Sequence, residues 1–97
     1  MQHETLDRTC QASVSAANLL RLGMNAHASE LIVSIVDGVI ELLRDAPPEI
    51  ADPIGQILAE TVAAQERGDL LREADLLEFE LAPCLQEAHA RGDRLAS

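Results

Sequence analysis

Two pairs of side chains have the types and spacing that metal ligation would require, namely His3 with Asp7 and His27 with Glu30. Residues three or four positions apart share one face of a helix, so each pair could supply two ligands from one side. A di-iron helical protein also needs two Glu-x-x-His motifs, and no Glu precedes a His by three residues in this sequence. We therefore interpret the histidines as surface residues and expect neither a metal nor another cofactor.

His27 allows a second chemical interpretation, because it lies near the start of an expected helix in an alanine-rich stretch. Histidine phosphotransfer domains are helical bundles of similar size, but they carry a Lys and a Gly shortly after the phosphorylated His. Here the following residues are Ala28, Ser29 and Glu30, and the Glu30 carboxylate would repel a phosphoryl group. A small helical enzyme or phosphotransfer protein that uses His27 is kept as the alternative function.

The other reactive residue types are dispersed. All seven basic residues are arginines spaced singly along the chain, unlike the converging cations of a helical enzyme of the chorismate mutase type. Neither a P-loop nor a G-x-S-x-G motif is present in the sequence. Cys10 and Cys84 are 74 residues apart and match no redox or metal motif, so we expect two separate thiols without a disulfide. The sequence predicts no catalytic residue.

The composition narrows the function classes further. The 97 residues carry 17 acidic against 7 basic side chains, a net charge of −10, and 47% of them are hydrophobic. This length and hydrophobic content fit one folded domain over residues 1–97. The negative charge disfavours nucleic acid and anionic membranes as partners, and a single aromatic ring, Phe79, offers no base-stacking surface. We find no basic leader or membrane-spanning apolar run, which favours a cytoplasmic location.

Helical periodicity predicts an all-α protein, and the short connections between its segments predict an antiparallel four-helix bundle. The expected helices cover residues 4–22, 26–45, 53–67 and 69–91. In the first of them, apolar residues recur at intervals of four, four and three, at Leu6, Cys10, Val14 and Ala17. Gly23 then provides a residue that can end this helix.

The second segment, residues 31–43, is apolar at nine of thirteen positions, and its polar residues recur every three or four positions. The Asp37-Gly38 pair in its middle would also fit the turn of a β-hairpin. We favour the helix because adjacent apolar pairs break the alternation of a half-buried strand. In a helix, Gly38 becomes a point of close approach for a neighbour. A helix this apolar needs cover nearly all round, so we expect a homo-oligomer, with a dimer favoured.

Prolines indicate where the second helix ends and the third begins. Pro47 and Pro48 should end the second helix, because they remove two backbone donors. Asp52 and Pro53 then supply an N-cap and a first-turn proline for the third helix. This helix carries small residues every four positions, which would allow close helix packing: Gly55, Ala59 and Ala63.

Gly68 and Asp69 have the types expected at the end of one helix and the N-cap of the next. From there, apolar residues follow alternating d and a positions of a heptad. These positions are 70, 74, 77, 81, 84 and 88. Pro83 lies inside this pattern, so we expect the fourth helix to kink there or to restart with Pro83 in its first turn.

The fourth helix carries two features beside its apolar seam. Four glutamates repeat every seven residues and form what we call the acidic rail: Glu66, Glu73, Glu80 and Glu87. Three apolar residues are expected to point away from the seam, among acidic neighbours, and form what we call the apolar strip: Leu76, Phe79 and Pro83. An exposed apolar patch with a polar rim is typical of a protein interface. The alternative is that another helix of the same protein covers the strip.

The segments AQERGD, residues 64–69, and ADLLEFEL, residues 74–81, are similar to a segment of small bacterial all-helical proteins that form a domain of unknown function. Those proteins often have Tyr where this chain has Phe79. The resemblance covers about a fifth of the chain and implies a helix-turn-helix hairpin at Gly68 and Asp69, but no activity.

Together these patterns predict a non-enzymatic cytoplasmic interaction module, an adaptor or chaperone-like acidic helical bundle. The acidic rail and the apolar strip would bind a basic amphipathic helix of a partner protein, because charge and apolar area are then matched. Self-association would cover the remaining apolar surface.

Overall fold

The computed structural model describes the backbone of residues 3–96 and the side chains of residues 4–91, and every regular element in it is a helix. The first three helices are α1 (His3–Arg21), α2 (Asn25–Leu43) and α3 (Pro48–Arg67). A fourth helical stretch follows without a break, made of α4 (Leu70–Asp75), the π-helix η1 (Leu76–Leu81) and α5 (Ala82–Ala96). The prediction of an all-α protein with four helices is confirmed.

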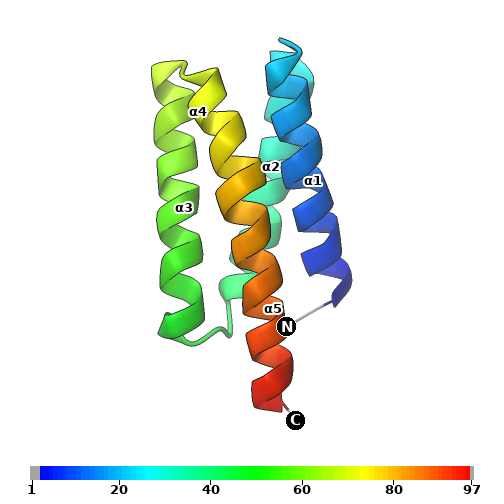
Figure 1. Ribbon diagram of the computed structural model, residues 1–97, viewed down its shortest axis with the longest axis vertical. Helices are drawn as coiled ribbons and strands as arrows, with labels where there is room; N and C mark the ends of the chain where they lie inside the picture. Colours follow the sequence, from blue (N-terminus) through cyan, green and yellow to red (C-terminus); the bar gives the residue numbers. More distant parts are fainter. Residues whose placement is uncertain (1–2, 97) are drawn as a thin grey trace.

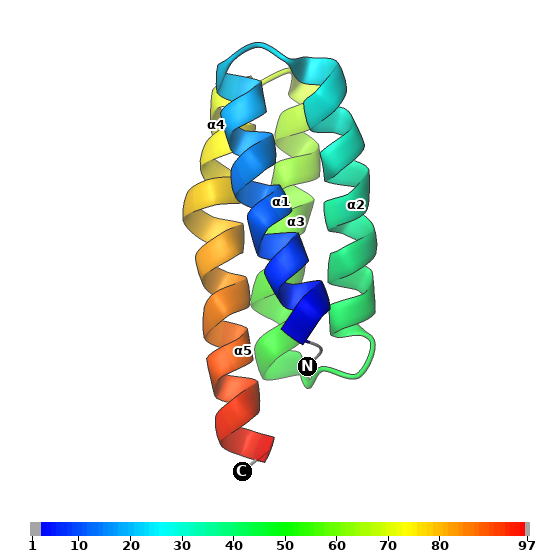
Figure 2. The ribbon, with the colours of Figure 1, turned by 90° about the vertical axis from the view of Figure 1, so that its right-hand side faces the viewer.

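The four helical stretches lie side by side, and each runs antiparallel to the one before it in the chain (Figure 1). The molecule extends over 43, 21 and 19 Å along its three principal axes. α1 packs against α2 on one side and against α4, η1 and α5 on the other, as Figure 2 shows. α3 packs mainly against α4 and η1 and only lightly against α2. The core therefore lies between α1 and α3, with α2 closing one side and the fourth stretch closing the other.

The buried face of α1 differs in one position from the expected pattern. Leu6, Cys10 and Ala17 are buried as predicted, but Val14 lies on the surface and Ser13 takes the core position. Ser13 can be buried because its hydroxyl donates a hydrogen bond to the backbone carbonyl of Thr9, at 2.9 Å. A serine whose hydroxyl is hydrogen-bonded within its own helix can thus occupy a core position that a pattern of apolar residues does not predict.

α2 is continuous through Asp37 and Gly38, so the β-hairpin alternative is wrong. Its buried residues are spaced by three or four positions: Ala28, Ile32, Ile35, Val39 and Leu42. Gly38 faces α1, where an added Cβ atom would overlap the hydroxyl of Thr9. The prediction of a close approach at Gly38 is confirmed.

α3 begins at Pro48, five residues before the predicted start, and Pro53 lies inside the helix. Pro47 precedes it with an extended backbone, and Pro48 occupies the first turn, where a missing N–H costs nothing. Two core residues one turn apart, Ile50 and Ile54, are both buried and hold this first turn against the core. Their burial offsets the backbone hydrogen bond that Pro53 removes, so the predicted boundary at Pro53 was wrong.

The turn between α3 and α4 agrees with the sequence prediction. Gly68 ends α3 in the left-handed conformation, with φ 74°. The Asp69 side chain caps α4 by accepting a hydrogen bond from the backbone N–H of Arg72, at 3.2 Å. Both residues therefore have the roles that the sequence indicated.

Pro83 explains why a π-helix interrupts the fourth stretch. In an α-helix its ring would clash with the carbonyl of Phe79, four residues earlier. In η1 the backbone N–H of Ala82 instead donates to the carbonyl of Leu77, five residues earlier, and the wider turn makes room for the ring. Pro83 thus lies in the first turn of α5, as predicted.

Candidate protein interface around Phe79

The three residues of the predicted apolar strip do not lie on one surface. Phe79 is 64% exposed and Pro83 is exposed, but Leu76 is only 1% exposed. Leu76 lies three positions after the buried Glu73 on the same helix face, and this face is covered because α1 and α3 pack on both sides of the fourth stretch. Leu76 and Leu77 are consequently both buried. The expectation that Leu76 points away from the core was wrong, and Phe79 with Pro83 remains at the surface.

The acidic rail is also interrupted. Glu66 and Glu87 are exposed on α3 and α5, whereas Glu73 in α4 is only 1% exposed. Glu80 is half-buried, and its carboxylate lies 3.3 Å from the guanidinium of Arg72. A continuous line of solvated glutamates is therefore contradicted, because α4 is flanked by α1 and α3.

Glu73 is the most unusual polar residue of the described structure. Neither carboxylate oxygen has a hydrogen-bond partner among the described residues. Burial away from water raises the pKa of Glu73 above its ordinary value. An unpaired buried carboxylate destabilises the folded protein, so this side chain favours its protonated form more than a surface glutamate does.

Phe79 lies among three charged side chains. We call the four residues together the Arg21 cluster: Arg21, Asp75, Glu78 and Phe79. The guanidinium of Arg21, in the last turn of α1, pairs with Asp75 at 3.1 Å and also with Glu78. The same guanidinium lies over the Phe79 ring, with 5.4 Å between its carbon and the ring centre. Hydrogen bonds to Glu78 and then to Asp75 raise the pKa of Arg21 above its ordinary value.

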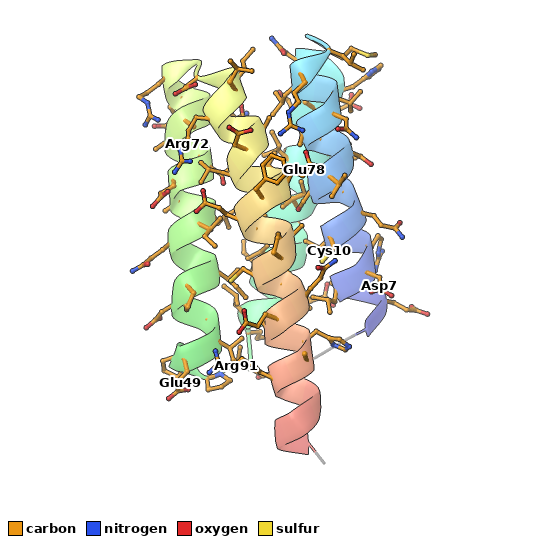
Figure 3. The ribbon with its side chains drawn as sticks, in the orientation of Figure 1. Asp7, Cys10, Glu49, Arg72, Glu78 and Arg91 are labelled. Atoms are coloured by element: carbon orange, nitrogen blue, oxygen red, sulfur yellow. The ribbon has the colours of Figure 1, made fainter. Side chains whose placement is uncertain are left out.

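Arg72 forms a second cross-link on the fourth stretch. Its guanidinium lies 3.3 Å from carboxylate oxygens of both Glu60 on α3 and Glu80 on η1. Figure 3 shows Arg72 between α3 and α4, and Glu78 between η1 and α1. Arginines from α1 and α4 thus pair with the acidic residues on either side of Phe79 in the chain, Glu78 and Glu80. Sequence reasoning missed this, because both arginines stand alone in the sequence.

The histidine and cysteine candidates whose side chains are described are not brought together. The His27 side chain is exposed at the start of α2, as is Glu30, and the side chain of His3 lies outside the described residues. Within the described part of the chain, no group of three His, Cys, Asp or Glu residues could hold a metal ion. Among the described residues, the fold therefore adds no third His, Cys, Asp or Glu ligand to the pair of His27 and Glu30.

Both cysteines are free thiols in the structure. Cys10 is buried, and its Sγ donates to the carbonyl oxygen of Ala82 at 3.8 Å, while Cys84 is half-buried. Burial raises the pKa of each thiol, and the negative charges of Asp7 and Glu87 add to the effect at Cys10 and Cys84 respectively. Thiols held in the neutral form are poor nucleophiles and poor metal ligands.

A pocket of about 260 Å³ opens between α1 and α2, away from the Arg21 cluster. Its lining is polar apart from Ala12 and Gly38, and consists of Thr5, Arg8, Thr9, Ala12, Ser34, Asp37, Gly38 and Glu41. The Thr9 hydroxyl in it donates to the carbonyl of Thr5 at 2.7 Å. Among the residues whose side chains are described, no His or Cys lines the pocket.

No protein-family model, curated protein or solved structure matches the chain. Among the described helices, none combines the length and the apolar character needed to cross a membrane.

Proposed function

We propose that the protein is a non-enzymatic interaction module that binds a partner protein through Phe79. The observation that supports this is the exposed Phe79 ring, oriented by Arg21 rather than covered by a neighbouring helix. A large aromatic side chain that is already held in one orientation loses little conformational entropy on binding, and such residues dominate the energetics of protein interfaces. Pro83, exposed four residues further on, extends the apolar area.

The partner that fits this surface best is a basic amphipathic helix. The carboxylate of Asp75 is half-exposed although it pairs with Arg21, and Glu66 and Glu87 are exposed on the neighbouring helices. A net charge of −10 would attract a positively charged partner at long range and speed its association. An adaptor or chaperone-like role in the cytoplasm is the specific form of this proposal.

A co-purification experiment tests the role of Phe79. Tagged wild-type protein, Phe79→Ala and Leu71→Ala are used to capture partners from a native lysate, and captured proteins are compared quantitatively. Leu71 is the matched control, because it is 71% exposed on α4 and lies outside the Arg21 cluster. We expect at least one partner to be lost with Phe79→Ala and retained with Leu71→Ala, while circular dichroism shows an unchanged helical spectrum.

Two results would contradict the proposal. One is that Phe79→Ala retains every partner of the wild-type protein. The other is that both alanine variants lose the same partners, since the effect would then not be specific to the Phe79 surface.

A further inference from the structure

The surface of α2 carries an apolar stripe that the described residues leave partly open. Val33 and Ile40 are 62% and 57% exposed, and Val36 and Leu43 are half-buried. These four residues are spaced by three, four and three positions, which places them along one face of the helix. We call them the α2 stripe. Leucine, isoleucine and valine at such spacing form the contact seam of paired helices.

The position of α1 explains why the α2 stripe stays open. Gly38 faces Thr9 of α1. Two residues along a helix are separated by a rotation of about 160° around its axis. Val36 and Ile40, each two positions from Gly38, therefore lie on nearly the opposite side of α2. Within the described residues, α2 packs against α1 and lightly against α3, and against no other helix. Figure 2 shows α2 at the edge of the molecule, with α4 and α5 on the far side of α1.

Charged residues beside the stripe indicate what covers it. Glu30, Asp37 and Arg44 follow one another at intervals of seven residues, along the flank next to Val33 and Ile40. All three are exposed, and neither Glu30 nor Arg44 has an ion-pair partner in the part of the chain that is described. The order of charges along this flank is therefore acidic at one end and basic at the other.

We propose that the α2 stripe binds a second copy of this chain, with the two α2 helices antiparallel. A two-fold axis near Asp37 brings Glu30 of each copy beside Arg44 of the other, because both residues are seven positions from Asp37. The same axis brings the two Asp37 carboxylates near each other, and their repulsion is opposed by the two Glu30–Arg44 pairs. The antiparallel orientation is the one in which Glu30 and Arg44 of different copies lie on the same side of the interface and can pair. A uniformly basic partner would meet Arg44 unfavourably.

The flank of α3 enlarges the contact area. Leu58 is half-buried on the side of α3 opposite Glu60, the residue that pairs with α4 through Arg72. Gly55 lies on the same flank, and a Cβ atom there would meet nothing within 4 Å. The stripe itself covers only about 15 Å of helix, so contacts from this flank are needed for an interface of ordinary size. We expect a dimer with a dissociation constant in the micromolar range.

Sedimentation equilibrium over a range of concentrations tests the dimer with three variants. Ile40→Glu places a charge in the stripe and should weaken dimerisation at least tenfold. Glu30→Arg should also weaken it, because the arginine introduced in each copy would then face Arg44 of the other. The double variant Glu30→Arg, Arg44→Glu exchanges the two charges and should restore the wild-type dissociation constant. Phe79→Ala, on another surface, is the matched control and should leave it unchanged.

Several outcomes would overturn the proposal. A wild-type protein that stays monomeric at tens of micromolar would exclude the dimer. A dimer that survives Ile40→Glu but dissociates with Phe79→Ala would use the other surface. A double charge variant no better than Glu30→Arg alone would refute the antiparallel arrangement. Circular dichroism and thermal melts of each variant show whether a lost dimer reflects an unfolded chain instead.

Discussion

Gly38 of α2 and Thr9 of α1 are in direct contact, and the contact leaves no space for a side chain at residue 38. A Cβ atom there would overlap Oγ1 of Thr9, with Cβ and Cγ2 of Thr9 each 3.5 Å away. The hydroxyl of Thr9 is held in place by its hydrogen bond to the carbonyl of Thr5, at 2.7 Å. The absence of a side chain on Gly38 therefore sets the distance between α1 and α2.

Gly38→Ala should lower the free energy of unfolding by about 1–3 kcal/mol, because the new methyl group forces Thr9 to rotate or α1 to move. This loss outweighs the gain of up to about 1 kcal/mol that alanine brings to a helix interior. Gly55→Ala is the matched control, where open space permits the helix-propensity gain alone. Urea denaturation of dilute protein measures both. Combining Gly38→Ala with Thr9→Ala should recover stability, and a stabilised Gly38→Ala single variant would contradict the tight contact.

Glu73→Met should raise the free energy of unfolding at neutral pH by about 1–3 kcal/mol, because it removes an unpaired buried carboxyl group while keeping a side chain of similar length. The gain should depend on pH. Burial raises the pKa of Glu73 in the folded state, so the folded protein holds this proton to higher pH than the unfolded chain does. The wild-type protein then loses stability as the pH rises from 4.5, the ordinary pKa of a glutamate, through the raised pKa of Glu73 in the folded state.

The difference between Glu73→Met and the wild-type protein should therefore be smaller at pH 4 and below, and constant once the pH exceeds the pKa of folded Glu73. Denaturation at several pH values measures it. Glu87→Gln, at an exposed glutamate, controls for the general effect of removing one negative charge. A difference that does not vary with pH would show that Glu73 has the same pKa in both states.

Arg21→Gln should lower the Tm by a few degrees at low ionic strength, because it removes the pairing with Asp75 and Glu78 that links α1 to the fourth helical stretch. Added salt should shrink the difference, since these side chains are partly exposed. Arg8→Gln is the control, because Arg8 makes no ion pair within the described residues. Equal effects of the two substitutions would show that the Arg21 cluster adds no stability of its own.

Cys84 should react with a thiol reagent before Cys10, because Cys84 is half-buried and Cys10 is buried beneath α5. Both should react more slowly than free cysteine at neutral pH, because burial raises the pKa of each thiol. Stopped-flow measurements on Cys10→Ser and Cys84→Ser assign the two rates. A faster reaction in Cys84→Ser than in Cys10→Ser would reverse the expected order. Fewer than two titratable thiols in the denatured wild-type protein would reveal a disulfide.

Residues whose roles depend on their sequence neighbours could be predicted from the sequence. Gly68 and Asp69 form the turn between α3 and α4 as expected, because a left-handed glycine and a capping aspartate act within a few residues of themselves. The helical period of residues 31–43 likewise identified α2 against the hairpin alternative. The local signal failed at Asp52 and Pro53, which look like a helix start although Ile50 is already held by the core.

Residues whose roles depend on a second helix were decided by the tertiary structure alone. A seven-residue spacing could not show that Glu73 lies between α1 and α3 while Glu66 and Glu87 stay exposed. Nor could it show Arg21 crossing to Phe79, 58 positions later in the chain. Helical periodicity reports which residues share a face, and hydrophobicity reports that a face is buried. Neither says which helix will cover it, because that depends on contacts between segments far apart in the sequence.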